Sequence, residues 1–123
     1  MVSCYCGSES SFKNCCQPYI NKSQKAPTAE ALMRSRYSAF ATGSADYLIA
    51  TTHPSKRKFH KKADILAWSK SNQWVKLEIL VSTETTVTFK AYYLDAQLQA
   101  QIHFEHSTFV YENDSWYYVE GSY

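Results

Sequence analysis

Four cysteines lie close together near the N-terminus of this chain, and they limit its fold more than any other feature of the sequence. They stand at Cys4, Cys6, Cys15 and Cys16, so eight residues separate two close pairs. Four thiolate sulfurs at this spacing are typical of a structural zinc ion, whose closed tetrahedral shell leaves no position open for catalysis. Two disulfides or four free thiols are the alternatives, although a bond between adjacent cysteines strains the backbone. We therefore expect one structural Zn²⁺ ion in a segment over residues 1–22.

The remaining composition is that of a globular protein, and we expect this protein in the cytoplasm. The 123 residues allow one domain beside the cysteine segment, and no apolar stretch approaches the ~20 residues that cross a bilayer, so we expect no membrane contact. Residues 1–4 have neither the basic nor the apolar part of a signal peptide, and thiols in a reducing cytoplasm stay free to bind metal. The formal net charge of +2 falls to zero once four thiolates and a Zn²⁺ ion are counted, so net charge gives no support for a nucleic-acid partner.

The clearest helical pattern begins after Thr28, a favourable N-cap residue, and ends at Gly43. One face of this predicted helix is apolar and carries Leu32, Met33, Ala39 and Phe40. Arg36 falls inside the apolar face, where an arginine either extends its head to solvent or buries it against a carboxylate. We predict the buried arrangement, in which Arg36 pairs with Glu105 or, as a second choice, with Glu78.

Two features follow the long helix. Residues 46–51 predict a short helix that a following proline ends, and His53 stands at this end. We expect His53 to cap free backbone carbonyls; the alternative is that it points into a cavity as an acid or base. Residues 56–62 hold five Lys or Arg residues around Phe59, a pattern that can bind phosphates and stack a base. A single short run favours an exposed loop and the entry to a helix over 63–69, so we expect no nucleic-acid partner.

The second half of the chain predicts a mostly antiparallel sheet. Alternating apolar residues indicate strands over 74–82 and 87–93, and a polar turn at 113–115 joins a strand over 98–112 to a last strand over 116–120. The third strand is ambiguous, because one parity carries Ile102, Phe104 and Val110 and the other carries Glu105, Ser107, Phe109 and Tyr111. A bulge would reconcile the two. Helices first and strands after predict an α+β fold, in which a curved sheet wraps around the long helix.

Two resemblances extend these expectations. The run from Cys4 through Gly7 and Ser8 to Cys15 and Cys16 resembles the SEC-C motif, the zinc-binding tail segment of the secretion ATPase SecA. Here tyrosine stands at position 5 where the motif usually has proline, and glutamate at position 9 where it usually has glycine. Neither difference removes a ligand.

The chain as a whole resembles the YchJ-like family of uncharacterised bacterial proteins. The resemblance rests on residues 29–40, 47–48, 50–54 and 116–121. It implies a SEC-C zinc segment joined to a nuclear transport factor 2-like, cystatin-like domain over residues 26–123, a cone whose helices and sheet enclose a cavity. Residues 104–109 resemble the family's His-Glu-x-Ser-x-Phe segment, but Phe104 replaces the expected histidine.

Two functions are compatible with this sequence. The first is a non-enzymatic module, in which the zinc segment docks a protein partner and the cone domain is a scaffold or binds a small ligand. The second is an enzyme that uses a polar cavity for acid and base chemistry on a small substrate. The candidate cavity residues are Arg36, Glu105, Ser107, His53 and Glu78, with His103 and His106 as further candidate bases. No Gly-rich phosphate loop or nucleophile elbow is present, so we favour the module, and the contents of the cavity distinguish the two.

Overall fold

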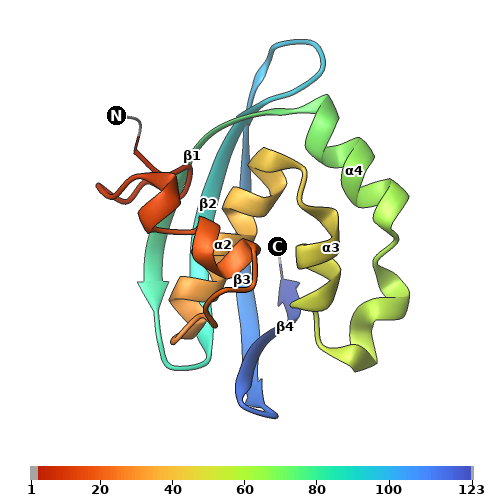
Figure 1. Cartoon of the computed structure of the whole chain (residues 1–123). Helices are drawn as coiled ribbons and strands as arrows, with labels where there is room; N and C mark the ends of the chain where they lie inside the picture. The colour runs from red at the N-terminus through yellow and green to blue at the C-terminus, as the bar shows by residue number, and fades with distance from the viewer. Residues whose placement is uncertain (1–2, 123) are drawn as a thin grey trace.

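The structure is a computed structural model that describes residues 3–122, with helices in the first half and strands in the second (Figure 1). The helical elements are the 3-10 helices η1 (Phe12–Asn14) and η2 (Pro54–Phe59) and the α-helices α1 (Gln17–Ile20), α2 (Ala29–Thr42), α3 (Ala45–Ala50) and α4 (Lys62–Ser71). The strands are β1 (Gln73–Ser82), β2 (Thr86–Leu94), β3 (Ala100–Glu112) and β4 (Ser115–Ser122). They form an antiparallel sheet in the order β1-β2-β3-β4, so the predicted α+β fold is confirmed.

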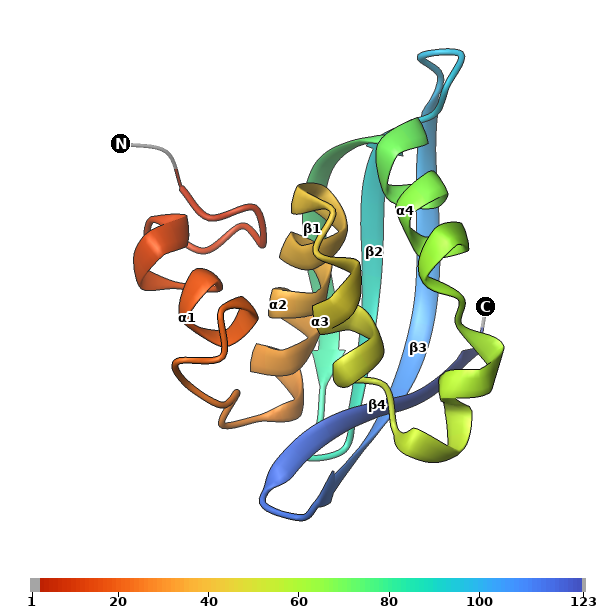
Figure 2. The ribbon, with the colours of Figure 1, turned by 45° about the vertical axis from the view of Figure 1, so that its right-hand side comes forward.

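Helix α2 lies at the centre of the molecule. Its start is capped by the Thr28 hydroxyl, which accepts a hydrogen bond from the Ala31 amide at 3.0 Å, and it ends at Gly43 in the left-handed conformation with φ 74°. Figure 2 shows the N-terminal segment on one side of α2 and α4 on the other, with the sheet behind the helices. The helix is therefore buried on more than its apolar face, and even Ser35 and Ser38 are fully buried.

Strand β3 resolves the ambiguity of its sequence. Glu105, Ser107 and Phe109 are buried under the helices, whereas Ile102 and Phe104 are 56% and 45% exposed on the outer face. The bulge lies where β3 pairs with β4, because the register shifts between positions 108 and 109. The face of β3 that carries Glu105 and Ser107 is thus the inward one.

Strand β1 departs from the predicted alternation. Leu77 is buried, but Val75 and Val81, which share its parity, are 59% and 57% exposed. Register shifts between positions 74 and 76 and between 79 and 81 explain the difference, because a bulge turns the side chains beyond it to the other face. The hairpin between β3 and β4 is as expected, and both Asn113 and Asp114 have the positive φ of its tight turn.

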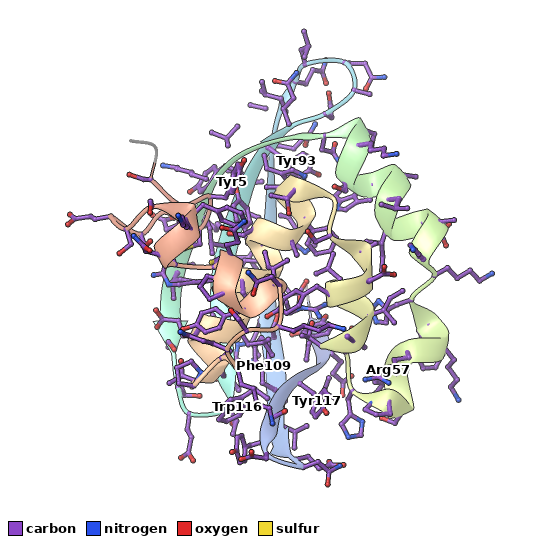
Figure 3. All side chains as sticks on the ribbon, in the orientation of Figure 1. Tyr5, Arg57, Tyr93, Phe109, Trp116 and Tyr117 are labelled. Carbon is purple, nitrogen blue, oxygen red and sulfur yellow. The ribbon has the colours of Figure 1, made fainter. Side chains whose placement is uncertain are left out.

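The basic run over 56–62 forms most of η2 where a loop was predicted, and it leads into α4 as predicted. Arg57 is structural: it donates to the carbonyls of Ile49, Ala50 and Thr52, where α3 ends (Figure 3). Phe59 is 68% exposed, so the outer part of the run faces solvent as expected. None of the helices within residues 3–122 combines the length and apolar character that a membrane span requires.

Candidate functional site

The four cysteines converge on one point beside α2. Their sulfurs all lie within 4.8 Å of one another, with 3.7 Å between Cys6 and Cys15 and 3.9 Å between Cys15 and Cys16. Four sulfurs bound to zinc at ~2.3 Å in a tetrahedron lie about 3.8 Å apart, so the donor set and its spacing fit such an ion. A hydrogen bond from Cys16 lowers the pKa of Cys6 to about 4, and the same contact raises the pKa of Cys16, so the two sulfurs share one proton.

Local turns and α2 hold this cluster in place. Gly7 adopts a φ of 89° that glycine permits, and its amide closes a turn on the Cys4 carbonyl at 3.0 Å. The Ser8 hydroxyl donates to the Cys15 sulfur at 3.0 Å, and the Ser38 hydroxyl of α2 lies 3.6 Å from the Cys4 sulfur. Such outer contacts orient metal ligands.

Arg34 contributes an anchor that sequence analysis missed. It lies on the far side of α2 from the cavity, where its Nε pairs with Glu30 at 3.0 Å and its Nη1 donates to the Cys6 carbonyl at 2.9 Å. A glutamate four residues before an arginine predicts the first contact. The contact with the Cys6 carbonyl depends on where the cysteine segment lies in the folded chain, so no local sequence pattern predicts it.

A cavity of about 350 Å³ lies between the helices and the inner face of the sheet. Its apolar wall comes from α2, α4, β1 and β2 and includes Phe40, Ile65, Trp68, Trp74, Phe89 and Ala91. Its polar lining includes Arg36, Thr52, His60, His103, Glu105 and Tyr118. A volume of this size and a mostly apolar lining with a few convergent polar groups are typical of small-molecule sites.

Arg36 points inward, as predicted, but it pairs directly with no carboxylate among residues 3–122. Its Nη1 donates to the Leu48 carbonyl at 2.9 Å and the Thr51 hydroxyl at 2.7 Å. A weaker contact reaches the Thr52 hydroxyl at 3.4 Å, and Cζ lies 4.5 Å from the centroid of the Tyr118 ring. Burial lowers the pKa of Arg36 to about 10. Its Nε and Nη2 donate to no acceptor within residues 3–122.

Glu105 is held by neighbours from the sheet instead. Its Oε1 lies 2.9 Å from His103 Nε2, and its Oε2 accepts hydrogen bonds from the hydroxyls of Ser107 and Tyr118. Burial by itself raises the pKa of Glu105, but these three hydrogen bonds outweigh it and hold the pKa below its usual value. The predicted ion pair with Arg36 is therefore replaced by an indirect link, because Tyr118 offers its ring to the guanidinium and its hydroxyl to the carboxylate.

Two other predicted cavity residues lie elsewhere. Glu78 is exposed on β1, where it accepts a hydrogen bond from the Tyr92 hydroxyl at 3.0 Å, because it alternates with the inward-facing Leu77. His53 caps the start of η2 by accepting from the Ser55 amide, and its Nε2 lies 3.0 Å from Glu112. It caps an amide and not the predicted carbonyls, since the chain turns into a new helix at this position. Neither residue lines the cavity.

Among the histidines, His60 and His103 line the cavity, whereas His106 is exposed and lies 2.7 Å from the Thr88 hydroxyl. Sequence analysis missed His60, which stood inside the basic run, and Tyr118, one of many tyrosines. Tyr118 could have been found from the pairing of β4 with β3, because residues directly opposite each other on paired strands face the same side of the sheet. For His60 no pattern was available.

Glu105→Gln is expected to weaken the dependence of the free energy of unfolding on pH in the acid range. Because the pKa of Glu105 is lowered in the folded chain, its ionised form stabilises the fold above the unfolded-state pKa of about 4.3, and this contribution is lost as the pH falls through the folded-state pKa. Glutamine keeps the shape of the side chain and does not titrate. Urea unfolding between about pH 3 and 6 should therefore show a shallower loss for Glu105→Gln than for wild type. The exposed Glu78→Gln control should follow wild type, and equal slopes for all three chains would contradict the assignment.

Comparisons with known proteins place the chain among bacterial relatives. The family described as YchJ, middle NTF2-like domain, matches residues 28–121. A UPF0225 protein of Photorhabdus laumondii is 38% identical over 125 residues, covering 96% of this chain and 79% of the relative. The UPF0225 protein YchJ of Shigella dysenteriae is 36% identical, covering 97% and 82%.

Two solved structures are similar over nearly the whole chain. The solution structure of a SEC-C motif containing protein from Rhodopseudomonas palustris has a TM-score of 0.90 and 33% identity, and the match covers 98% of each chain. The crystal structure of a SEC-C motif containing protein from Psychrobacter arcticus has a TM-score of 0.80 and 28% identity, with 98% of this chain and 81% of that one covered.

Proposed function

Because this chain belongs to the YchJ family, whose middle domain is NTF2-like, we propose that it is a non-enzymatic binding protein built from two parts. The proposed parts are a zinc-bound docking segment over residues 1–22 and a ligand-binding cone domain over 26–123. We place it in the cytoplasm, where reducing conditions keep the four thiols available to metal.

The metal in this proposal is a structural Zn²⁺ ion held by Cys4, Cys6, Cys15 and Cys16. Bound there, the ion would cross-link the two cysteine pairs and supply no chemistry, since four sulfurs complete its shell. Three of the cysteines also belong to the hydrophobic core that contains α2. The cysteine segment is therefore fastened to the domain by packing, whereas the ion would hold together the segment itself.

The observation that carries the binding proposal is the cavity of about 350 Å³, which holds a buried arginine with unused donors beside aromatic walls. Polar groups directed into an apolar cavity are the arrangement that fixes the orientation of a small ligand. A scaffold would instead be expected to seal its buried cation within a complete set of acceptors.

Ligand binding in the cavity is tested by filling it. Ala91 on β2 is 4% exposed and lines the cavity, so Ala91→Leu should remove space that a ligand needs. Ala100→Leu on β3 adds the same atoms at an exposed position and is the matched control. Small organic acids, amides and amines are screened by ligand-observed NMR and by the fluorescence of Trp68 and Trp74. We expect hits that bind wild type and the control but not Ala91→Leu; hits that are indifferent to Ala91→Leu would contradict the proposal.

The docking role of the cysteine segment is tested with variants that separate surface from metal. Tyr5 is 48% exposed and packs edge-on against Phe12, so Tyr5→Ala changes the surface and leaves all four cysteines. A pull-down compares it with wild type, with Cys15→Ser/Cys16→Ser and with Lys58→Ala on η2 as the control. We expect wild type and Lys58→Ala to retain one protein partner that both Tyr5→Ala and Cys15→Ser/Cys16→Ser lose. Retention of every partner by both variants would contradict docking through this segment.

An acid–base enzyme is the second candidate, and the His103–Glu105 pair in the cavity favours it. Arg36 would then orient a substrate beside this pair. Conversion of a cavity ligand by wild type, lost in Glu105→Gln while binding persists, would decide for the enzyme.

A further inference from the structure

We propose that the ligand of this cavity is a small monocarboxylic acid with an apolar body, whose carboxylate lies against the Nε and Nη2 edge of Arg36. The proposal rests on the proposed function in one respect, namely that the cavity binds a ligand. It goes further by stating the chemical class of that ligand and the group that recognises it.

The first argument is the unbalanced charge of Arg36. The side chain is buried with 6% of its surface exposed, and its protein partners are a carbonyl, two hydroxyls and an aromatic ring, all of them neutral. No carboxylate lies within ion-pair distance of it among residues 3–122. A buried cation without a carboxylate is unfavourable, and an anionic ligand would relieve that cost.

The second argument is where the unused donors lie. Within residues 3–122, one side-chain polar atom is both fully buried and without a hydrogen-bond partner, and it is Tyr37 Oη. The nitrogens of Arg36 that lack a partner are therefore not fully buried. The unbonded nitrogens of Arg36 therefore border open space, and the cavity is the space that Arg36 lines. Nε and Nη2 form two parallel N–H donors on one edge of the guanidinium, a fork that matches the two oxygens of a carboxylate.

The third argument limits the ligand to one negative charge. Glu105 is ionised on the same cavity wall and accepts three hydrogen bonds, so it repels a second anion and has little need of a cationic group. The other charged lining residues, Lys61 and Asp64, carry opposite charges that offset each other, and burial and the nearby Arg36 lower the pKa of His60, which favours its neutral form. Trp68 and Trp74, whose rings lie 6.0 Å apart, belong to the aromatic wall that favours an apolar body.

The experiment pairs each acid with its uncharged isostere. Benzoate, phenylacetate, indole-3-acetate and hexanoate are titrated into the zinc-loaded full chain, each beside its primary amide, with phenylmalonate as a dianion and phenethylamine as a cation. Isothermal titration calorimetry and protein NMR measure the affinity. We expect at least one acid to bind ten-fold or more tightly than its own amide. It should also bind more tightly than phenylmalonate and phenethylamine by the same factor.

The arginine is tested by substitutions that keep its volume. Arg36→Met should remove the preference for acid over amide, and Arg36→Lys, which keeps the charge without the fork, should reduce it several-fold and serves if the methionine variant does not fold. Lys76→Met is the matched control, because Lys76 also lies over a tyrosine ring, at 4.6 Å from the Tyr92 centroid, but on an exposed strand position. This control should keep the wild-type preference.

The outcomes separate this inference from the proposed function. Amides or amines that bind the cavity as tightly as the acids, or acids whose binding is unchanged in Arg36→Met and Arg36→Lys, would overturn the carboxylate assignment and leave cavity binding intact. If no acid, amide or amine binds wild type, both are overturned.

Discussion

Replacing Cys6 by serine is expected to remove the metal from the chain and to destabilise the whole N-terminal half. Cys6 has no exposed surface, and its sulfur lies 3.7 Å from that of Cys15, so the variant loses a ligand and gains a buried hydroxyl. Loss of a structural metal is among the few single changes that cost about 4 kcal/mol or more, because metal binding and folding are coupled. Metal analysis should show well under half an equivalent of zinc, against one equivalent in wild type. Thermal unfolding should begin at a much lower temperature.

A chelator provides the internal control for this prediction. Wild type treated with a strong zinc chelator under reducing conditions should unfold at the temperature of the variant, and the variant should not respond to the chelator. Stoichiometric zinc in Cys6→Ser, or a melting temperature that equals that of wild type, would contradict the assignment of the four cysteines as ligands.

Gly121→Ala is expected to be the most damaging single change in the sheet. Gly121 pairs with Ser107 across β3 and β4, and a Cβ built on it would lie 2.7 Å from Glu105 Cγ and closer still to Cδ and Oε2. Glu105 has no room to yield without breaking hydrogen bonds to His103, Ser107 and Tyr118. Overpacking and the loss of buried hydrogen bonds together should cost about 2 to 4 kcal/mol in urea unfolding.

A double-mutant cycle shows whether Glu105 is the cause. In a Glu105→Ala background the clashing atoms are gone, so adding Gly121→Ala should cost less than about 0.5 kcal/mol beyond the first substitution. The cycle should therefore give a large interaction energy between the two positions. An equal cost of Gly121→Ala in both backgrounds would place the damage in the backbone of β4 and not at the buried carboxylate.

Local patterns predicted the parts of the fold that depend on neighbours in sequence. The N-cap at Thr28, the stop at Gly43 and the tight turn at Asn113 and Asp114 are all formed as expected, since each depends on backbone conformation within a few residues. Helical periodicity also placed Arg36 inside the molecule, because residues on an apolar face of a helix share the direction of that face.

The partners of buried polar groups could not be predicted in the same way. Arg36 and Glu105 are both inside, yet a tyrosine stands between them, and its position depends on the pairing of β4 with β3 across a bulge. Glu78 could enter the cavity only if β1 reversed its faces there, and between the two register shifts Leu77 keeps the inward face, so Glu78 stays outside. A one-residue change of register reverses every side chain beyond it, so the facing of a strand residue is known only once the bulges are located.

The sequence by itself therefore determined the cysteine cluster, the long central helix and the order of helices and strands, because spacing and periodicity act over short distances along the chain. Only the tertiary structure decided what fills the space between them. The contact of Arg34 with the Cys6 carbonyl and the unused donor edge of Arg36 depend on the approach of segments far apart in sequence. Strand bulges and core packing determine how these segments approach one another. Both depend on interactions across the whole molecule, which no short sequence pattern contains.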